Sequence, residues 1–253
     1  MSALGLDSIN ILAERLLASV RKNPLYSGLI GTGVLGSVWI INDYNEWVAF
    51  GTGGSPPNPF GYFRMTLLRI MFAYHIPNQT NHNTISDGEP SYLKTSIAPR
   101  AGGGPKMMPR ILPQRQVPEF IDPSTENYLM KLVNEIGRAH PDLVEVKPSV
   151  NEGKTTDGIY ARKENPKLNP LVLSQHRLDG EIAHAHPNDR SLHVWLSTSD
   201  ARKVVEAGWG RRFPLPIVHA GWIMVYAPRT TSEMEVIEHI VKAGVRWVTG
   251  VAI

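Results

Sequence analysis

Three histidines in one short stretch have the residue type and spacing to do chemistry: His184, His186 and His193. Residues 181–186 and 191–196 are each typical of a strand, and residues 187–190 (Pro-Asn-Asp-Arg) are typical of a turn. With a four-residue loop, His193 pairs with His184, and Ser191, the first residue of the second strand, pairs with His186. We therefore expect all three imidazoles to share one face of a sheet.

These histidines have three interpretations. A neutral imidazole takes a proton near pH 7, and a second one can stabilise an anion, which favours a proton-transfer site. Two histidines one residue apart with a third opposite also suit Fe, Zn or Cu, with Glu181 or Asp189 as a further ligand. Strand parity places Glu181 on the other face, which argues against that ligand. The third interpretation is structural hydrogen bonding.

Composition excludes several functions. The chain has no cysteine, so it has neither disulfides nor a thiolate metal site. The net charge is +3 with no run of basic residues, so we expect no nucleic-acid partner. The G-x-G-x-x-G pattern at residues 31–36 follows Asn23-Pro24 rather than a strand, so we do not interpret it as a dinucleotide site.

The N-terminal part predicts a membrane anchor. Residues 7–20 have helical periodicity, and residues 23–42 are uncharged, apolar and long enough to span a bilayer. A buried glycine-rich helix hairpin is the alternative. Basic residues precede the segment, which favours a cytoplasmic N-terminus and a body across the membrane. We expect membrane association at the endoplasmic reticulum. Residues 78–80 (Asn-Gln-Thr) form a glycosylation sequon, which would be modified if the body lies in the lumen.

The remaining pattern predicts an α+β fold in which an antiparallel sheet is flanked by helices, after an N-terminal helical membrane-anchor region. We divide the chain into N-terminal helices with the anchor, a Pro/Gly-rich loop, and a catalytic domain: residues 1–76, 77–118 and 119–253. Predicted helices cover residues 61–76, 124–137, 199–207 and 232–248. Predicted further strands cover residues 158–161, 171–173 and 221–226.

Two details of this prediction concern capping and charge. Ser124 is expected to cap the helix at 124–137, and Ser232 with Glu235 forms a capping box for the last helix. The loop at 77–118 carries scattered positive charge, which is typical of a solvated linker. Its basic residues are Arg100, Lys106, Arg110 and Arg115.

Several motifs together resemble the fungal luciferases and their luciferase-domain relatives. The resemblance rests on Glu181-Ile-Ala-His184-Ala-His186, His193, Gly208-Trp-Gly-Arg-Arg212-Phe213-Pro-Leu and Trp222-Ile-Met-Val-Tyr226-Ala-Pro-Arg229. Further likeness lies in Asp43-Tyr44 and in Asn58-Pro-Phe-Gly-Tyr62, so it covers nearly the whole chain. The family has a histidine where this chain has Phe213, and the loop at 214–221 is shorter here.

The resemblance implies an oxygenase that needs no cofactor. Fungal luciferases add O2 to a hydroxylated pyrone, 3-hydroxyhispidin, and a peroxidic intermediate then loses CO2 with emission of light. The partners implied are an aromatic pyrone and O2. The implied catalytic residues are His184, His186, His193 and Arg212, with the three histidines as the alternative metal ligands. The implied substrate-binding residues are Glu181, Trp195, Trp209, Trp222, Tyr226 and Arg229.

Overall fold

The structure is a computed structural model, and it describes residues 11, 14–15, 17–72, 78–110 and 112–253. By their internal contacts these residues form two compact units, 1–50 and 51–253. The predicted helix at 7–20 lies partly outside the described residues; residues 17–22 are helical.

The first unit is dominated by one continuous helix, α2 (Pro24–Phe50). An 18-residue window of α2 has a mean hydropathy of 1.4, and none of it is buried. By length and composition this helix can cross a membrane, and it contains the predicted span 23–42. The alternative of a buried helix hairpin is wrong, because the segment neither turns back nor lies in a core.

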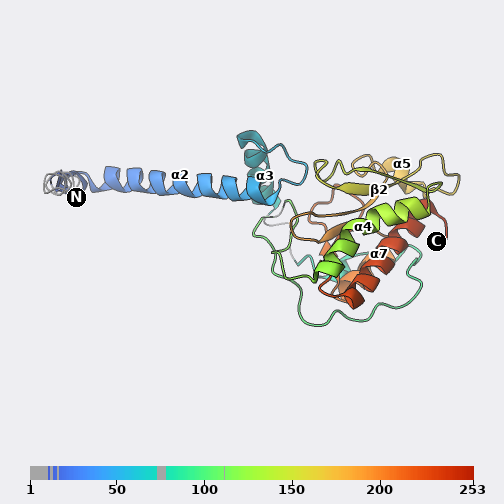
Figure 1. Cartoon of the computed structure of the whole chain (residues 1–253). Helices are drawn as coiled ribbons and strands as arrows, with labels where there is room; N and C mark the ends of the chain where they lie inside the picture. The colour runs from blue at the N-terminus through green and yellow to red at the C-terminus, as the bar shows by residue number, and fades with distance from the viewer. Residues whose placement is uncertain (1–10, 12–13, 16, 73–77, 111) are drawn as a thin grey trace. The chain divides into compact units, whose positions relative to one another are not determined.

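The second unit is built on a six-stranded antiparallel sheet with the order β1-β2-β3-β4-β6-β5 (Figure 1). The strands are β1 (Val144–Pro148), β2 (Asp157–Ala161), β3 (Glu181–Ala185), β4 (Leu192–Trp195), β5 (Gly210–Arg212) and β6 (Trp222–Val225). The predicted α+β class with an antiparallel sheet is confirmed. Strands β1 and β5 were not predicted.

Two helices, α4 (Pro123–Ala139) and α7 (Thr231–Thr249), pack side by side across one face of the sheet (Figure 1). Their apolar stripes bury Leu129 and Ile237 completely. Each helix begins one residue earlier than predicted. Asp122 caps α4 and Thr230 caps α7, because these side chains accept the free N–H groups of the first turns.

Shorter elements complete the second unit: α3 (Pro59–Phe72), η1 (His82–Thr84), α5 (Leu171–Ser174) and α6 (Thr198–Glu206). The predicted strand at 171–173 is wrong, because α5 occupies it. Asn169 accepts the N–H of Leu171 at 3.0 Å, and Pro170 has helical dihedral angles, so the chain coils here instead of extending.

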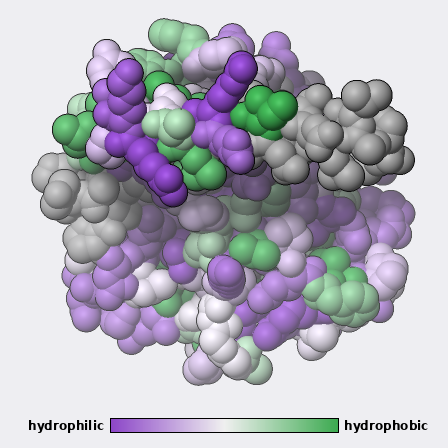
Figure 2. Space-filling view, turned by 90° about the vertical axis from the view of Figure 1, so that its left-hand side faces the viewer, coloured by the Kyte–Doolittle hydropathy of each residue, from purple (hydrophilic) through white to green (hydrophobic). Residues whose placement is uncertain are grey.

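The segment from residue 78 to residue 118 has little regular structure, as expected of a long loop. Beyond η1, its described part has one isolated bridge, Met107 to Gln116. It is not a solvated linker throughout, because Arg100 and Arg115 are buried in the second unit. On the face drawn in Figure 2, hydrophobic and hydrophilic residues are interspersed.

Candidate functional site

The hairpin of β3 and β4 brings the three histidines together on the sheet face opposite α4 and α7. His184 pairs with His193, and the N–H of His186 donates to the carbonyl of Ser191 at 2.8 Å. This is the predicted register. The ring centroids lie 4.8 to 5.3 Å apart, and all three side chains are buried.

A β-bulge adds Glu181 to this face. Between β2 and β3, Ile159 pairs with Ala183 and Tyr160 pairs with Glu181, so Ile182 has no partner. One extra residue reverses the alternation of side chains, which makes the parity prediction for Glu181 wrong. Its Oε1 lies 2.9 Å from Nδ1 of His184.

A glycine makes room for that carboxylate. Gly158 pairs with His184 across the strands, and a Cβ at Gly158 would lie 2.6 Å from Oε1 of Glu181. The second carboxylate oxygen, Oε2, accepts from the Asn151 amide at 2.5 Å. Burial alone would raise the pKa of Glu181, yet the charge and hydrogen bond of His184 bring that pKa below its ordinary value. Glu181 therefore stays an anion beside His184.

The outer nitrogen of His186 is also held by an acceptor. Its Nδ1 lies 2.7 Å from Oγ of Ser191, and that hydroxyl donates to Oδ2 of Asp189 at 2.8 Å. The hydroxyl proton is therefore engaged elsewhere, and His186 must donate from Nδ1. Burial raises the pKa of Asp189 despite the nearby charge of Arg115.

The outer nitrogen of His193 is held in the same way by Gln114. Nε2 of His193 lies 3.2 Å from Oε1 of Gln114. The amide nitrogen of Gln114 donates to the Gln79 side chain and to the Arg212 carbonyl, which settles which end of the amide is oxygen. His193 therefore carries its hydrogen on Nε2.

The inner nitrogens of His186 and His193 consequently face each other without hydrogens, and Nε2 of His184 lies beside them. Nε2 of His186 lies 3.0 Å from Nδ1 of His193, which lies 3.4 Å from Nε2 of His184. Bare lone pairs at this distance repel unless a cation lies between them. The cluster is built to accept one proton or one metal ion.

Charge around the cluster comes from a buried ion pair. Nη1 of Arg115 lies 3.1 Å from Nε2 of His186, and Nη2 donates to both carboxylate oxygens of Glu152. Burial, and then the charge of Arg115, lower the pKa of His186 well below its ordinary value. Burial and the neighbouring histidines do the same to the pKa of His193. Both rings are neutral at rest.

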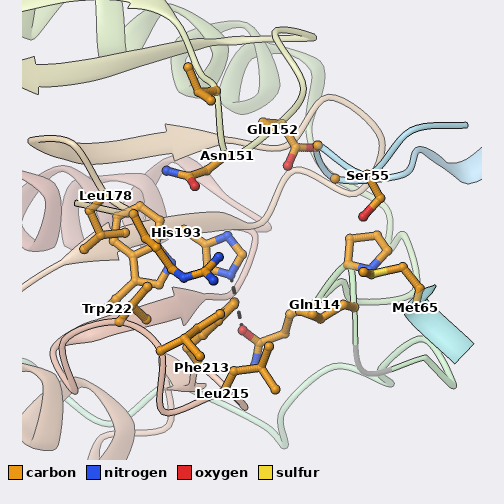
Figure 3. Close-up of a pocket in the computed structure, with 18 of the residues that line it drawn as sticks. Ser55, Met65, Gln114, Asn151, Glu152, Leu178, His193, Phe213, Leu215 and Trp222 are labelled. Atoms are coloured by element: carbon orange, nitrogen blue, oxygen red, sulfur yellow. Dashed lines mark hydrogen bonds between the residues drawn. The ribbon is translucent and has the colours of Figure 1, made fainter. Parts of the chain in front are cut away.

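A cavity of about 330 Å³ opens onto this cluster. His184 and His193 line it. Figure 3 shows the rings of Trp222 and Phe213 beside His193, where they form flat walls. The other lining residues include Ser55, Met65, Leu68, Gln114, Arg115, Asn151, Glu152, Leu178 and Leu215. The ring of His193 stacks on Trp222 with an interplanar angle of 14° at 5.5 Å. The cavity suits a flat molecule with an acidic edge.

The other residues implied by the resemblance lie away from the cavity lining. Arg212 pairs with Ile223, which places it on the opposite face of the sheet, and its Nη1 donates to Thr84. Trp195 is buried and donates to Nδ1 of His219 at 3.0 Å.

Two more implied residues belong to packing around the rim of the sheet. Trp209 donates to the Ala98 carbonyl at 2.8 Å, and the ring of Tyr226 lies between Arg100 and Arg211. Likewise Arg229 bonds to the Glu233 carboxylate and to the carbonyl of Ala101, and it does not reach the cavity.

Sequence reasoning missed the polar residues that surround the histidines. Gln114 and Arg115 lie in the irregular segment, and Asn151 and Glu152 lie in the β1–β2 turn. The signal in the sequence is slight: Arg115 sits in a polar triplet, Gln-Arg-Gln, inside a Pro-rich loop. Nothing local indicates that this triplet is buried.

Comparison with known proteins agrees with this site. The Luciferase domain family matches residues 179–244, which contain the hairpin. A luciferase of Armillaria gallica is 27% identical over 96% of both chains, and a luciferase of Neonothopanus nambi is 27% identical over 96% of this chain and 94% of its own. The chain is thus similar to the fungal luciferases over nearly its whole length, as the motifs in its sequence suggest. No solved structure matches it.

The similarity to luciferases supports the prediction of an enzyme. Luciferases are oxygenase-type enzymes, so the predictions of an enzyme and of a small-molecule substrate with O2 are confirmed at that level. A luciferase of Armillaria mellea is also 27% identical, over 83% of this chain and 82% of its own. The likeness to the luciferases therefore extends well beyond the hairpin, into the segments that carry Arg115 and Glu152.

Proposed function

We propose that this luciferase-like protein is an oxygenase that adds O2 to a hydroxylated pyrone of the 3-hydroxyhispidin type, with loss of CO2. The observation that carries the proposal is the cluster of three imidazoles, two of which, His184 and His193, line an aromatic cavity. The overall reaction consumes substrate and O2 and yields product and CO2.

The first step is removal of the enol proton. His184 and His193 line the cavity, and His193 has a bare Nδ1 that lies 3.0 Å from the bare Nε2 of His186. A proton taken from the enol is held on Nδ1 of His193, because Nε2 of His186 already accepts from Arg115. The lowered pKa values of both rings keep the cluster free of a proton until substrate arrives.

The second requirement is stabilisation of the anions that form, first the enolate and then the peroxide. Arg115 supplies a fixed positive charge at the cavity, held in place by Glu152. A pre-oriented guanidinium in a site shielded from water stabilises developing negative charge at little cost in reorganisation. Trp222, Phe213 and Leu215 supply the apolar walls that exclude water from the peroxide.

A metal ion at the three histidines is the second candidate. Nitrogen ligands at about 2.1 Å from an ion, at angles between octahedral and tetrahedral, lie roughly 3.0–3.4 Å apart, and two pairs measure 3.0 and 3.4 Å. The acceptors on the outer nitrogens also resemble the support around metal-binding histidines. Arg115 favours the metal-free reaction, because it donates to the Nε2 lone pair of His186 that a metal would need.

The test follows O2 uptake, CO2 release and light from purified full-length protein with 3-hydroxyhispidin. We expect one CO2 per O2 consumed, activity that survives a chelator, and loss of activity in His184→Ala and His193→Ala. His176→Ala, at an exposed histidine, is the matched control. Absence of O2 uptake with a folded protein would refute the proposal, and activity that tracks bound metal on elemental analysis would establish the second candidate.

We further propose that α2 anchors the protein in the endoplasmic reticulum membrane with the second unit in the lumen. Asn78 is exposed, and the Thr80 hydroxyl donates to Oδ1 of Asn78 at 2.5 Å, so the sequon is accessible. Expression in fungal cells should give a glycan that a glycosidase removes and that Asn78→Gln abolishes. A protein of unmodified mass in the membrane fraction would place the second unit on the cytoplasmic side.

A further inference from the structure

Helix α3 has two different faces within the second unit. Met65 and Leu68 line the cavity above the histidines. The other side carries five large apolar residues whose exposed fractions run from 44% to 69%: Phe60, Phe63, Leu67, Ile70 and Met71. Their spacing places them on one stripe of the helix. The cavity wall and an exposed apolar stripe are therefore two sides of the same helix.

The charge on α3 fits one kind of surface. The helix contains no acidic residue and carries two arginines, Arg69 and Arg64, of which Arg64 also lines the cavity. A basic helix with an apolar stripe that includes two phenylalanines matches the interface of a bilayer that contains anionic lipid. An apolar stripe of this size on a water-facing helix would otherwise promote aggregation.

The chain connects this helix directly to the apolar helix α2. Residues 51–58 alone separate Phe50, the end of α2, from Pro59, the start of α3. If α2 enters a membrane, this short link keeps α3 within reach of the headgroup region. Because α2 lies next to α3 in the chain, a membrane that holds α2 is the surface most readily available to the apolar stripe.

We propose that α3 lies along a lipid bilayer, with its stripe from Phe60 to Met71 among the acyl chains and its Met65–Leu68 side closing the cavity. The catalytic cavity then sits at the membrane surface, and an apolar aromatic substrate dissolved in the bilayer is close to its wall. The placement of α3 does not depend on the reaction proposed above, so each can fail separately.

The absence of native cysteine makes a direct test possible. Phe63→Cys and Ile70→Cys variants of the full chain would be spin-labelled and placed in vesicles of phosphatidylcholine with some phosphatidylserine. The control is Glu164→Cys, at an exposed turn residue far from α3 in sequence. We expect O2 to relax the labels at 63 and 70 several-fold more, relative to a water-soluble nickel chelate, than it relaxes the label at 164.

The other occupants of the stripe give different results. A label at 63 that the nickel chelate reaches as freely as the label at 164 means that the stripe faces water. A label reached by neither agent, in vesicles and in detergent alike, means that α2 covers the stripe. Dipolar broadening that disappears on dilution with unlabelled protein means that a second copy covers it. Each of these results overturns the proposal.

Discussion

Nη1 of Arg115 lies 3.1 Å from Nε2 of His186, although the two residues are 71 positions apart in the chain. An irregular loop thus delivers the positive charge to a cluster that a hairpin builds. The same guanidinium is paired with Glu152, so three separate segments meet behind the cavity. The predictions below test what each contributes.

Replacing Arg115 should abolish most of the activity. Removal of one preorganised donor to a developing anion lowers kcat by about 10²-fold or more. Arg115→Met alone also leaves Glu152 buried without a partner, which costs roughly 3–5 kcal/mol of stability. The informative variant is therefore Arg115→Met with Glu152→Gln, measured by steady-state kinetics and by denaturant unfolding.

The control for Arg115 is Lys106→Met, because Lys106 is an exposed cation in the same loop. It should keep both stability and kcat. If the double variant is folded and turns over at the wild-type rate, Arg115 has a structural role only.

A bulkier residue on one side of α3 should block the cavity. Leu68→Trp fills space next to the histidines and should lower kcat/KM by about 10-fold or more. Leu67→Trp points the same ring outward and should leave kcat/KM unchanged when the assay is run in detergent. Equal effects of the two substitutions would mean that α3 does not bound the substrate site.

Acid should destabilise the protein before its carboxylates titrate. The pKa values of His186 and His193 in the folded protein lie well below the ordinary 6.5, so the unfolded chain binds protons below pH 6.5 that the native state does not. Stability is therefore full above pH 6.5 and falls by about 1 kcal/mol per histidine for each pH unit below it. Urea unfolding at pH 7.5 and pH 5.5 measures this difference.

The matched variants for that measurement are His193→Gln and His176→Gln. His193→Gln should reduce the loss of unfolding free energy between pH 7.5 and pH 5.5 by the contribution of one histidine. His176→Gln should not change that loss, because His176 is exposed. An unchanged loss in His193→Gln would mean that this ring does not resist protonation.

Arg229 should matter for stability and not for substrate. It bonds to the Glu233 carboxylate and to the Ala101 carbonyl, away from the cavity. Because the pair is partly exposed, Arg229→Gln should cost only about 1 kcal/mol of unfolding free energy. KM should not change, and a large rise in KM would return Arg229 to the substrate site that the family resemblance suggests.

The sequence predicted the histidine cluster well because a hairpin is a local structure. Four turn residues fix the pairing of His184 with His193. The alternation of side chains along each strand then places all three histidines on the same face of the sheet. The position of Glu181 could not be obtained in this way. Its alternation is reversed by Ile182, and that bulge arises where β3 pairs with β2, a strand separated from it by an unpatterned loop.

The remainder of the site depends on packing between distant segments. Gln114 and Arg115 belong to a loop whose composition resembles a linker, and their burial is set by the sheet beneath them. Arg212 is the converse case. It lies in a recognisable motif, yet the register of β5 against β6 places it on the other face.

The irregular segment also affects how related proteins should be compared. The stretch matched by the Luciferase domain, 179–244, holds the three imidazoles but begins after Gln114, Arg115 and Glu152. Under the proposed mechanism, a homologue that shares this stretch alone would have the proton acceptor without the cation that stabilises the resulting anion. We therefore expect activity only in homologues that also carry an arginine at the position of Arg115 and an acidic partner for it at the position of Glu152.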